Sequence, residues 1–256
     1  MFSPIVVILS IALIGTKKPI SANFETSSND TARVSVAYPE GTGDIYIKDC
    51  YALAYEEKHE QASWVQYLLT RKGLKQSPVK RSNDFREDTY ITTGSSEKGD
   101  YYRSGYDRGH LCPAADRSYS TLAMSHTFLM SNMSPQLPRF NRGIWKKLES
   151  EIRKYALKED SIIVVTGPVL TITPLGTIGA NNVTVPGAYY KAIYDLTPPH
   201  KTIAYILPHK EDLSKDLSQY CVSVDILENL TGIDFFPGIR EEKELESRNS
   251  YSAWSN

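Results

Sequence analysis

The 256 residues are enough for one large domain or two small ones, at roughly 150 residues per domain, and a chain of this length needs no disulfide or structural metal to fold. Hydrophobic residues make up 41% of the chain and charged residues 23%, which excludes a disordered or fibrous protein. The net charge is −1, from 29 basic and 30 acidic residues, so any binding of nucleic acid must come from local clusters of charge or from a metal.

An apolar run at the N-terminus, Ile5 to Ile14, is the first segment with a distinct character. It is too short to span a bilayer, so no integral membrane domain is expected. Small residues that follow it favour a signal peptide over residues 1–22, and hence a secreted or periplasmic protein. Lys17 and Lys18 come after the run, and no Lys or Arg precedes it, so an uncleaved membrane anchor is the alternative.

A polar segment at residues 23–42 predicts a flexible leader, and residues 43–256, which contain no repeats, are expected to form a single domain. Five runs are typical of strands and two of helices. The expected strands are Cys50–Tyr55, Trp64–Leu69, Ile162–Thr166, Ala188–Leu196 and Thr202–Leu207, and the expected helices are Asn141–Leu157 and Val222–Leu230. This mixed order predicts an α+β fold with a central, mostly antiparallel sheet flanked by helices.

Motif searches exclude several common sites. The sequence has no GxGxxG, Walker loop, HExxH or GxSxG, which are the signatures of dinucleotide, nucleotide, zinc-protease and hydrolase sites. Its three cysteines, Cys50, Cys112 and Cys221, are widely spaced and match no zinc or redox motif. They permit one disulfide, and the spacing leaves the pairing open, including a buried unpaired Cys112.

The motif Asp107-Arg108-Gly109-His110 places a cation, a glycine and a titratable base next to one another. Arg108 can hold phosphate oxygens bidentately, and His110, with an ordinary pKa of about 6.5, can take a proton from water near neutral pH. We expect Gly109 to allow a sharp turn between them, and Asp107 to hold the loop through backbone hydrogen bonds. Taken alone, the motif is equally consistent with a loop arginine and a structural histidine.

A second group, Asn141, Trp145, Glu149 and Arg153, repeats at intervals of four residues. On an α-helix this spacing places Asn141, Glu149 and Arg153 along one winding stripe. An Asn oxygen, with a Glu acting through water, suits Mg²⁺, which prefers oxygen ligands and keeps several waters. The alternative is an exposed Glu149–Arg153 ion pair with Asn141 as a helix N-cap.

Two segments are strongly basic despite the balanced total. The segment from Arg71 to Arg86 has six basic residues and one acid, and the segment from Arg139 to Lys158 has seven basic residues and two acids, so each carries a net charge of +5. Binding to a nucleic-acid backbone without base recognition needs such clusters. For the single lysines of the second segment, a solvated helix face is the alternative.

These motifs together resemble the DNA/RNA non-specific endonucleases of the ββα-metal (His-Me finger) class, which includes secreted bacterial nucleases and mitochondrial endonuclease G. The resemblance extends from about Tyr51 to the C-terminus, and several separated blocks occur in the family order. The blocks are Asp107–Arg117, Ser131–Gln136, Asn141–Glu149, Val165–Pro168, Pro186–Asp195, Ala204–Pro208 and Val222–Pro237.

The resemblance implies a metal-dependent reaction. His110 would be the general base that activates water, and Asn141 would directly hold a single Mg²⁺, for which Mn²⁺ or another divalent ion could substitute. Glu149 would orient water around that ion. The substrates would be DNA and RNA without base specificity, and the products would carry 5′-phosphate and 3′-hydroxyl ends.

The resemblance also implies roles around this centre. Arg108 and Arg153 would neutralise charge on the phosphate, and Asn132 would position either His110 or the substrate. Arg81 lies in a segment where family members often carry an arginine that contacts phosphate. Two other readings stay open, a phosphodiesterase acting on nucleotides or other small phosphodiesters and a non-catalytic binding module. A homodimer is also open, because family members differ in this respect.

Overall fold

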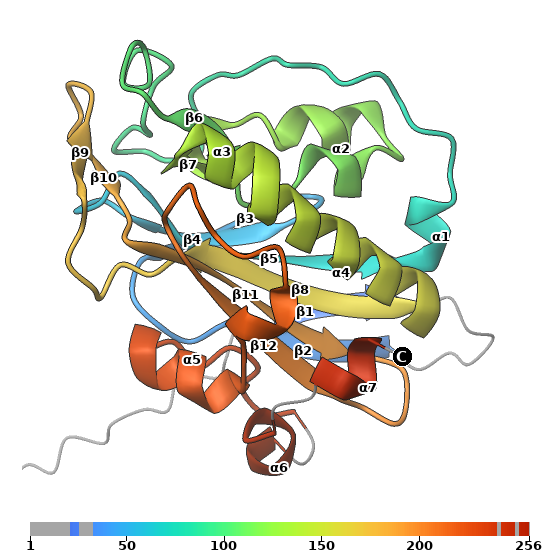
Figure 1. Cartoon of the computed structure of the whole chain (residues 1–256). Helices are drawn as coiled ribbons and strands as arrows, with labels where there is room; N and C mark the ends of the chain where they lie inside the picture. The colour runs from blue at the N-terminus through green and yellow to red at the C-terminus, as the bar shows by residue number, and fades with distance from the viewer. Residues whose placement is uncertain (1–20, 26–32, 240–241, 249–250, 256) are drawn as a thin grey trace, which may run out of the picture.

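The structure is a computed structural model that describes residues 21–25, 33–239, 242–248 and 251–255 (Figure 1). The signal peptide or anchor predicted at residues 1–22 lies outside this part of the chain except for its last two positions. None of the helices within the described ranges is both long and apolar enough to cross a bilayer.

A seven-stranded antiparallel sheet forms the centre of the molecule, in the order β13-β12-β11-β8-β5-β4-β3 (Figure 1). Its strands are β3 Asp44–Ile47, β4 Ala52–Glu56, β5 Gln61–Thr70, β8 Ser161–Pro168, β11 Ala188–Asp195, β12 Thr202–Pro208 and β13 Cys221–Val222. All five strands expected from the sequence belong to it, so the α+β fold with a mostly antiparallel sheet is confirmed.

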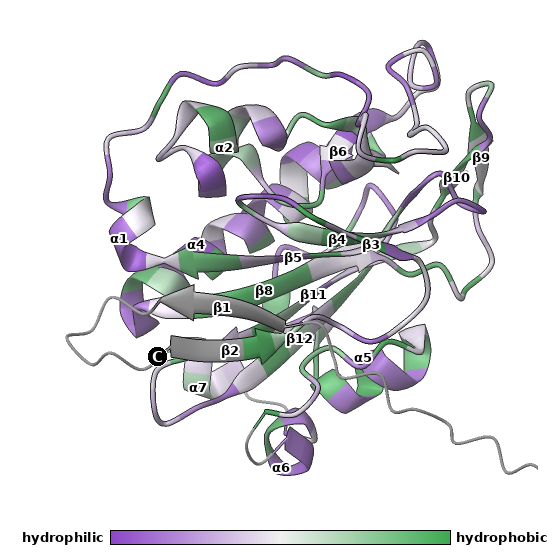
Figure 2. Cartoon of the chain, turned by 180° about the vertical axis from the view of Figure 1, so that it is seen from behind, coloured by the Kyte–Doolittle hydropathy of each residue, from purple (hydrophilic) through white to green (hydrophobic). Residues whose placement is uncertain are grey.

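Helices cover both faces of this sheet. Helix α4, Lys146–Glu159, packs its buried side chains on one face, and α5, Val224–Thr231, lies with α6, Glu242–Glu246, on the other (Figure 1). Because both faces are covered, every residue of β8 and β11 is buried. Strand β8 is accordingly hydrophobic over most of its length, whereas α6 shows mostly hydrophilic residues (Figure 2).

The shorter helices join these layers. Helix α5 agrees with the prediction, since the Ser223 side chain accepts from the Ile226 N–H at its start and Gly232 ends it with a positive φ of 70°. The remaining helices are α1 Arg71–Leu74, α2 Thr121–His126, α3 Pro138–Phe140 and α7 Tyr251–Ser255, with 3₁₀ turns at Ala114–Arg117, Met130–Asn132 and Leu217–Tyr220.

The N-terminal end of the domain differs from the prediction. Strand β2, Arg33–Ala37, pairs with β1, Ser21–Glu25, and Tyr38 stacks on Trp64 with 6.2 Å between ring centroids. The flexible leader predicted at 23–42 is therefore wrong at least from residue 33 onward. The polar composition of this segment concealed a few apolar residues that pack on the sheet.

A small ββα unit stands on the α4 side of the sheet. Strands β6, Asp107–His110, and β7, Met133–Gln136, pair antiparallel, and α3, a π-helical turn at Asn141–Trp145 and α4 follow in sequence. This order is the expected ββα-metal motif. A further hairpin, β9 Gly176–Ile178 with β10 Val183–Val185, packs beside it.

Candidate active site

His110 is the last residue of β6, and its ring packs against two aromatic side chains that also contact each other. The ring centroid lies 5.8 Å from that of Phe85 and 4.9 Å from that of Phe128, both in edge-to-face geometry. Its Nε2 atom is buried and has no hydrogen-bond partner among the described residues. A buried polar atom without a partner is costly, and at this position the unpartnered atom is a ring nitrogen that can accept a hydrogen bond from water.

Burial lowers the pKa of His110 to about 3, and the nearby cations Arg81 and Arg108 act in the same direction. A hydrogen bond with the Arg108 backbone opposes the shift but does not reverse it. His110 is therefore neutral at pH 7, which is the protonation state that a general base requires.

Two guanidinium groups flank this histidine. The Arg108 Cζ lies 4.1 Å from the centroid of the Phe85 ring, and the Arg81 Cζ lies 4.7 Å from that of Phe128. The two predicted phosphate-binding arginines are thus brought to the same site as His110. The sequence did not identify the two phenylalanines as neighbours of His110. The one available signal was that Phe85 is an aromatic residue inside the basic segment Arg71–Arg86.

Replacing Arg81 with alanine is expected to raise the pKa of His110, because the substitution removes a neighbouring cation and admits water. An NMR titration of the His110 ring from neutral pH to below its pKa of about 3 measures this change. Lys80→Ala is the matched control, since it removes an adjacent charge of the same sign that is not among the causes of the shift. An unchanged His110 titration in the Arg81 variant would contradict this electrostatic coupling.

Gly109 and Asp107 have roles different from those predicted. Gly109 lies in extended strand β6, and a Cβ at this position would come within 2.3 Å of the Gln136 side chain. The predicted sharp turn is wrong, and close packing of β6 on β7 is the reason for the glycine. Asp107 does not bond to its own loop. It accepts hydrogen bonds from the Asn141 Nδ2 at 2.9 Å and from the Arg142 Nη2 at 2.6 Å.

Asn141 begins the π-helical turn, and its side-chain orientation follows from the bond to Asp107. Because Nδ2 donates to the carboxylate, the Oδ1 atom points the other way and receives no hydrogen bond from a described residue. A free amide oxygen fits a hard divalent ion. The α-helix that was predicted from Asn141 onward begins only at Lys146, because Asn141–Trp145 form a π-helical turn.

Replacing Asp107 with alanine is expected to weaken the affinity of this site for the divalent ion that the family resemblance implies, by about 10- to 100-fold, because the Asn141 carboxamide loses the group that orients it. The dependence of cleavage rate on metal concentration measures this shift. Asp212→Ala is the control, since Asp212 is an exposed partner of Arg139. An unchanged metal dependence with a lower maximal rate would contradict the orienting role.

Glu149 and Arg153 lie together beside a buried aspartate, Asp116. The Arg153 Nη1 donates to the Asp116 Oδ1 at 2.8 Å, and the Tyr67 hydroxyl donates to Oδ2 at 3.0 Å. Burial, followed by the charge of Asp116, raises the pKa of Glu149 to about 7, while Lys191 and Arg153 act in the opposite direction. Arg153 thus neutralises a carboxylate within the protein, and its predicted contact with substrate stays a prediction.

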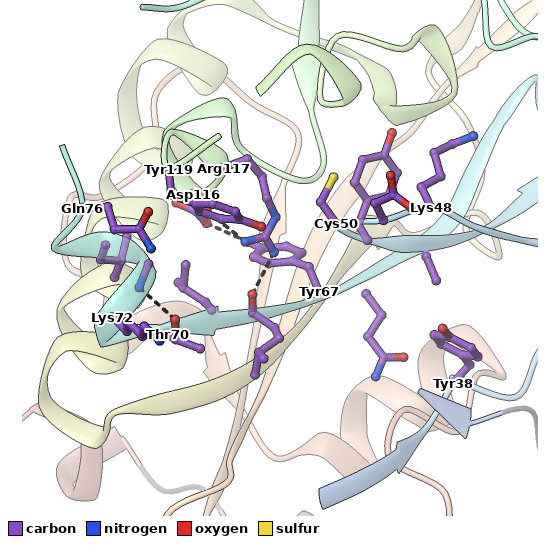
Figure 3. A pocket seen from close by; sticks show the side chains of 18 residues that line it. Tyr38, Lys48, Cys50, Tyr67, Thr70, Lys72, Gln76, Asp116, Arg117 and Tyr119 are labelled. Carbon is purple, nitrogen blue, oxygen red and sulfur yellow. Dashed lines mark hydrogen bonds between the residues drawn. The ribbon is translucent and has the colours of Figure 1, made fainter. Parts of the chain in front are cut away.

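Asp116 also borders a cavity of about 280 Å³ (Figure 3). Arg117 and Tyr67 line the cavity beside it, and Lys48 and Cys50 lie further along. This cavity is not lined by His110 or Asn141. The cavity is therefore distinct from the space around these two side chains.

Lys191, in the middle of β11, was missed as a functional residue. It is fully buried, its Nζ donates to the Thr166 Oγ1 at 3.0 Å and to the Leu111 carbonyl at 3.5 Å, and it lies 4.5 Å from the centroid of the Trp145 ring. Burial lowers its pKa while Glu149 opposes this. A lysine inside a buried apolar strand was the signal for it.

Asn132 holds the segment that follows His110. Its side chain is fully buried, its Oδ1 accepts from the Cys112 N–H at 2.8 Å, and its Nδ2 donates to the carbonyls of Cys112 and Thr127. Such a side chain cannot touch the substrate, so of the two predicted roles only the positioning of His110 fits. Cys112 is buried beside it, and none of the three cysteines forms a disulfide.

Comparisons with known proteins agree with this arrangement. The family model described as DNA/RNA non-specific endonuclease matches residues 29–242. A nuclease of Nostoc sp. (strain PCC 7120) is 33% identical over an alignment of 253 positions that covers 90% of each chain, and mitochondrial endonuclease G of Caenorhabditis elegans is 34% identical over 86% of this chain and 77% of its own.

A crystal structure of an EndoG/EndoGI complex resembles the fold with a TM-score of 0.72 and 32% identity, covering 78% of this chain and 88% of that one. Human mitochondrial endonuclease G is 30% identical over 78% of this chain and 71% of its own. The chain belongs to the DNA/RNA non-specific endonuclease family, and it is an endonuclease.

Proposed function

We propose that this chain hydrolyses phosphodiester bonds of both DNA and RNA, with His110 as the general base and a divalent ion, Mg²⁺ or Mn²⁺, held by Asn141. The observation that carries the proposal is the buried, unpartnered Nε2 of His110 between two arginines. A neutral imidazole nitrogen without a partner is the acceptor that the attacking water needs.

The residues at Asn141 fit such an ion, because its amide oxygen is left without a hydrogen bond while its nitrogen is fixed by Asp107. A divalent ion bound there would supply positive charge to the scissile phosphate and its leaving oxygen. The half-buried Glu149 is a candidate for orienting water near that oxygen.

The protein's own groups account for the other steps. The His110 Nε2 takes a proton from water as its oxygen attacks phosphorus, and the guanidinium groups of Arg108 and Arg81 neutralise the charge that accumulates on the phosphate. The departing 3′ oxygen takes a proton from water, which leaves 5′-phosphate and 3′-hydroxyl ends, and His110 releases its proton to solvent. Asn132 and Lys191 hold the two residues after His110, so they position the base without touching substrate.

The basic segment Arg71–Arg86 is a candidate path for the nucleic-acid backbone, although not all of its charges are available. Arg71 donates to the carbonyls of Leu157 and Lys158 at the end of α4, and Arg86 pairs with Asp84. The basic side chains that remain exposed in this segment are those of Lys72, Lys75, Lys80 and Arg81. Contacts of this kind carry no base specificity and weaken with salt.

Incubation of the purified protein with supercoiled plasmid and with RNA, each with Mg²⁺ or with chelator, tests the proposal. Degradation of both polymers that requires the metal is expected. Cleavage that persists in chelator would contradict the metal requirement. Activity on nucleotides or other small phosphodiesters, with both polymers left intact, would replace the proposal with the phosphodiesterase alternative.

The apolar run Ile5–Ile14 supports a further proposal, that the enzyme is secreted or periplasmic. N-terminal sequencing of the protein recovered outside the producing cell should give a start shortly after residue 22. Full-length protein retained in the membrane fraction would favour the anchor instead.

A further inference from the structure

Five carboxylates lie on the face of the sheet opposite α4 (Figure 1). The residues around His110 and Asn141 lie on the α4 side, so the sheet separates the two groups. Asp225 and Glu228 belong to α5, Asp234 to the segment after it, and Glu242 and Glu246 to α6. Three of them, Asp225, Glu228 and Glu246, each have a side-chain oxygen within 4.8 Å of the other two. An open cavity of about 380 Å³ is lined by four of the five acids, Asp225, Glu228, Asp234 and Glu242.

Glu246 distinguishes this group from an ordinary acidic surface. Glu246 is only 3% exposed, and its Oε1 atom is buried without a hydrogen-bond partner among the described residues. Asp234 also has a buried oxygen, Oδ1, without a partner. A buried carboxylate that lacks a partner is strongly disfavoured, so a group that neutralises it is needed.

Within the described ranges, no basic side chain pairs with any of the five acids. The hydrogen bonds that they accept come from backbone, with the Phe235 N–H bonded to Glu228 at 2.9 Å and the Gly238 N–H bonded to Glu242 at 2.8 Å. Among the described residues, therefore, no side-chain cation offsets these acids, and their ionised forms repel one another.

We propose that Asp225, Glu228 and Glu246, assisted by Asp234 and Glu242, form a binding site for Ca²⁺. Calcium accepts six to eight oxygen ligands in flexible geometry, whereas Mg²⁺ demands a near-ideal octahedron and gives up its waters reluctantly. A set of carboxylates from two helices and a connecting segment, with room for water in the cavity, matches the first ion better.

The bound ion would join separate parts of the chain. Helix α6 would be tied to α5, and both would be tied to Asp234, whose backbone pairs with Glu40 in two hydrogen bonds of 2.9 Å. The site is thus structural, and it fastens the C-terminal region and the N-terminal segment to the same face of the sheet. It is separate from the proposed active-site ion.

Thermal unfolding of the full-length protein in Ca²⁺ and in chelator tests the site. At a concentration about 100 times the dissociation constant, Ca²⁺ is expected to raise the Tm by about 5–10 °C. The same rise is expected for Asn141→Ala, which removes the active-site ligand, and no rise for Glu246→Gln. In chelator, Glu246→Gln should be at least as stable as the wild type, because it removes one charge from a repulsive cluster.

Asp225→Asn is the second variant, since Asp225 is half-buried and the substitution keeps its size; it should reduce the Ca²⁺ effect even if Glu246→Gln fails to fold. Isothermal titration with Ca²⁺ should detect the corresponding loss of binding. A Tm shift that survives both substitutions, or one that is lost in Asn141→Ala, would overturn the proposal. No shift in the wild type at up to about 10 mM Ca²⁺, above the affinities of extracellular calcium modules, would also overturn it.

Discussion

Replacing His110 with alanine is expected to lower the rate of cleavage by about 10²- to 10⁴-fold, the usual contribution of a general base. The substitution removes the neutral acceptor nitrogen from the site but leaves Arg81 and Arg108 on their aromatic partners. Binding of nucleic acid should therefore change little. Single-turnover cleavage and a separate binding measurement, both on one labelled duplex, resolve the two effects.

The control for this substitution is His59→Ala, which removes a half-buried histidine bonded to Thr184 and should leave the rate unchanged. Added imidazole offers a further check, because the space left by the missing ring is bordered by the Phe85 and Phe128 rings. Partial recovery of rate with imidazole would identify the lost function as proton transfer. Unchanged turnover in the His110 variant would refute the mechanism.

Replacing Asn141 with alanine is expected to abolish cleavage at ordinary metal concentration and to recover it partly at high Mg²⁺. The reason is that the variant lacks the oriented amide oxygen but retains His110 and both arginines. Cleavage rates over a wide range of Mg²⁺ concentration measure the shift.

Asn181→Ala is a closely matched control for this variant. The Asn181 Nδ2 donates to the Asp100 Oδ2 at 2.9 Å, as the Asn141 Nδ2 does to the Asp107 Oδ2. Loss of an Asn–Asp bond alone should therefore leave the metal dependence of the control unchanged. An Asn141 variant with normal activity and normal metal dependence would be incompatible with a metal ligand at this position.

The large sheet was predictable because its strands are buried on both faces. Strands such as Ile162–Thr166 therefore stand out as continuous apolar runs, and α5 carries both its cap and its terminating glycine in sequence. The short strands β6 and β7 have no such pattern. Asp107–His110 and Met133–Gln136 are mostly polar, and their pairing depends on distant packing, so the motif was read as a turn.

The site was predictable where chemistry is concentrated in a few adjacent residues, as in Arg108 and His110. It was not predictable where a group acts through the fold. Asp116 and Lys191 are ordinary charged residues in sequence, and only burial places them beside Glu149. The Phe85 and Phe128 rings that hold His110 are 43 positions apart, a distance at which sequence patterns carry no information about contact.

The π-helical turn at Asn141–Trp145 gives this end of the helix one residue more than regular α-helix would hold. A π turn closes its hydrogen bonds one residue later than an α turn, so the extra residue is taken up within the turn, and the residues before and after it keep nearly the phase of an uninterrupted α-helix. Shortening this stretch by one residue would favour ordinary α-helix. Deletion of the exposed Gly143 would thus remove the wide turn that Asn141 begins, with every named side chain still present.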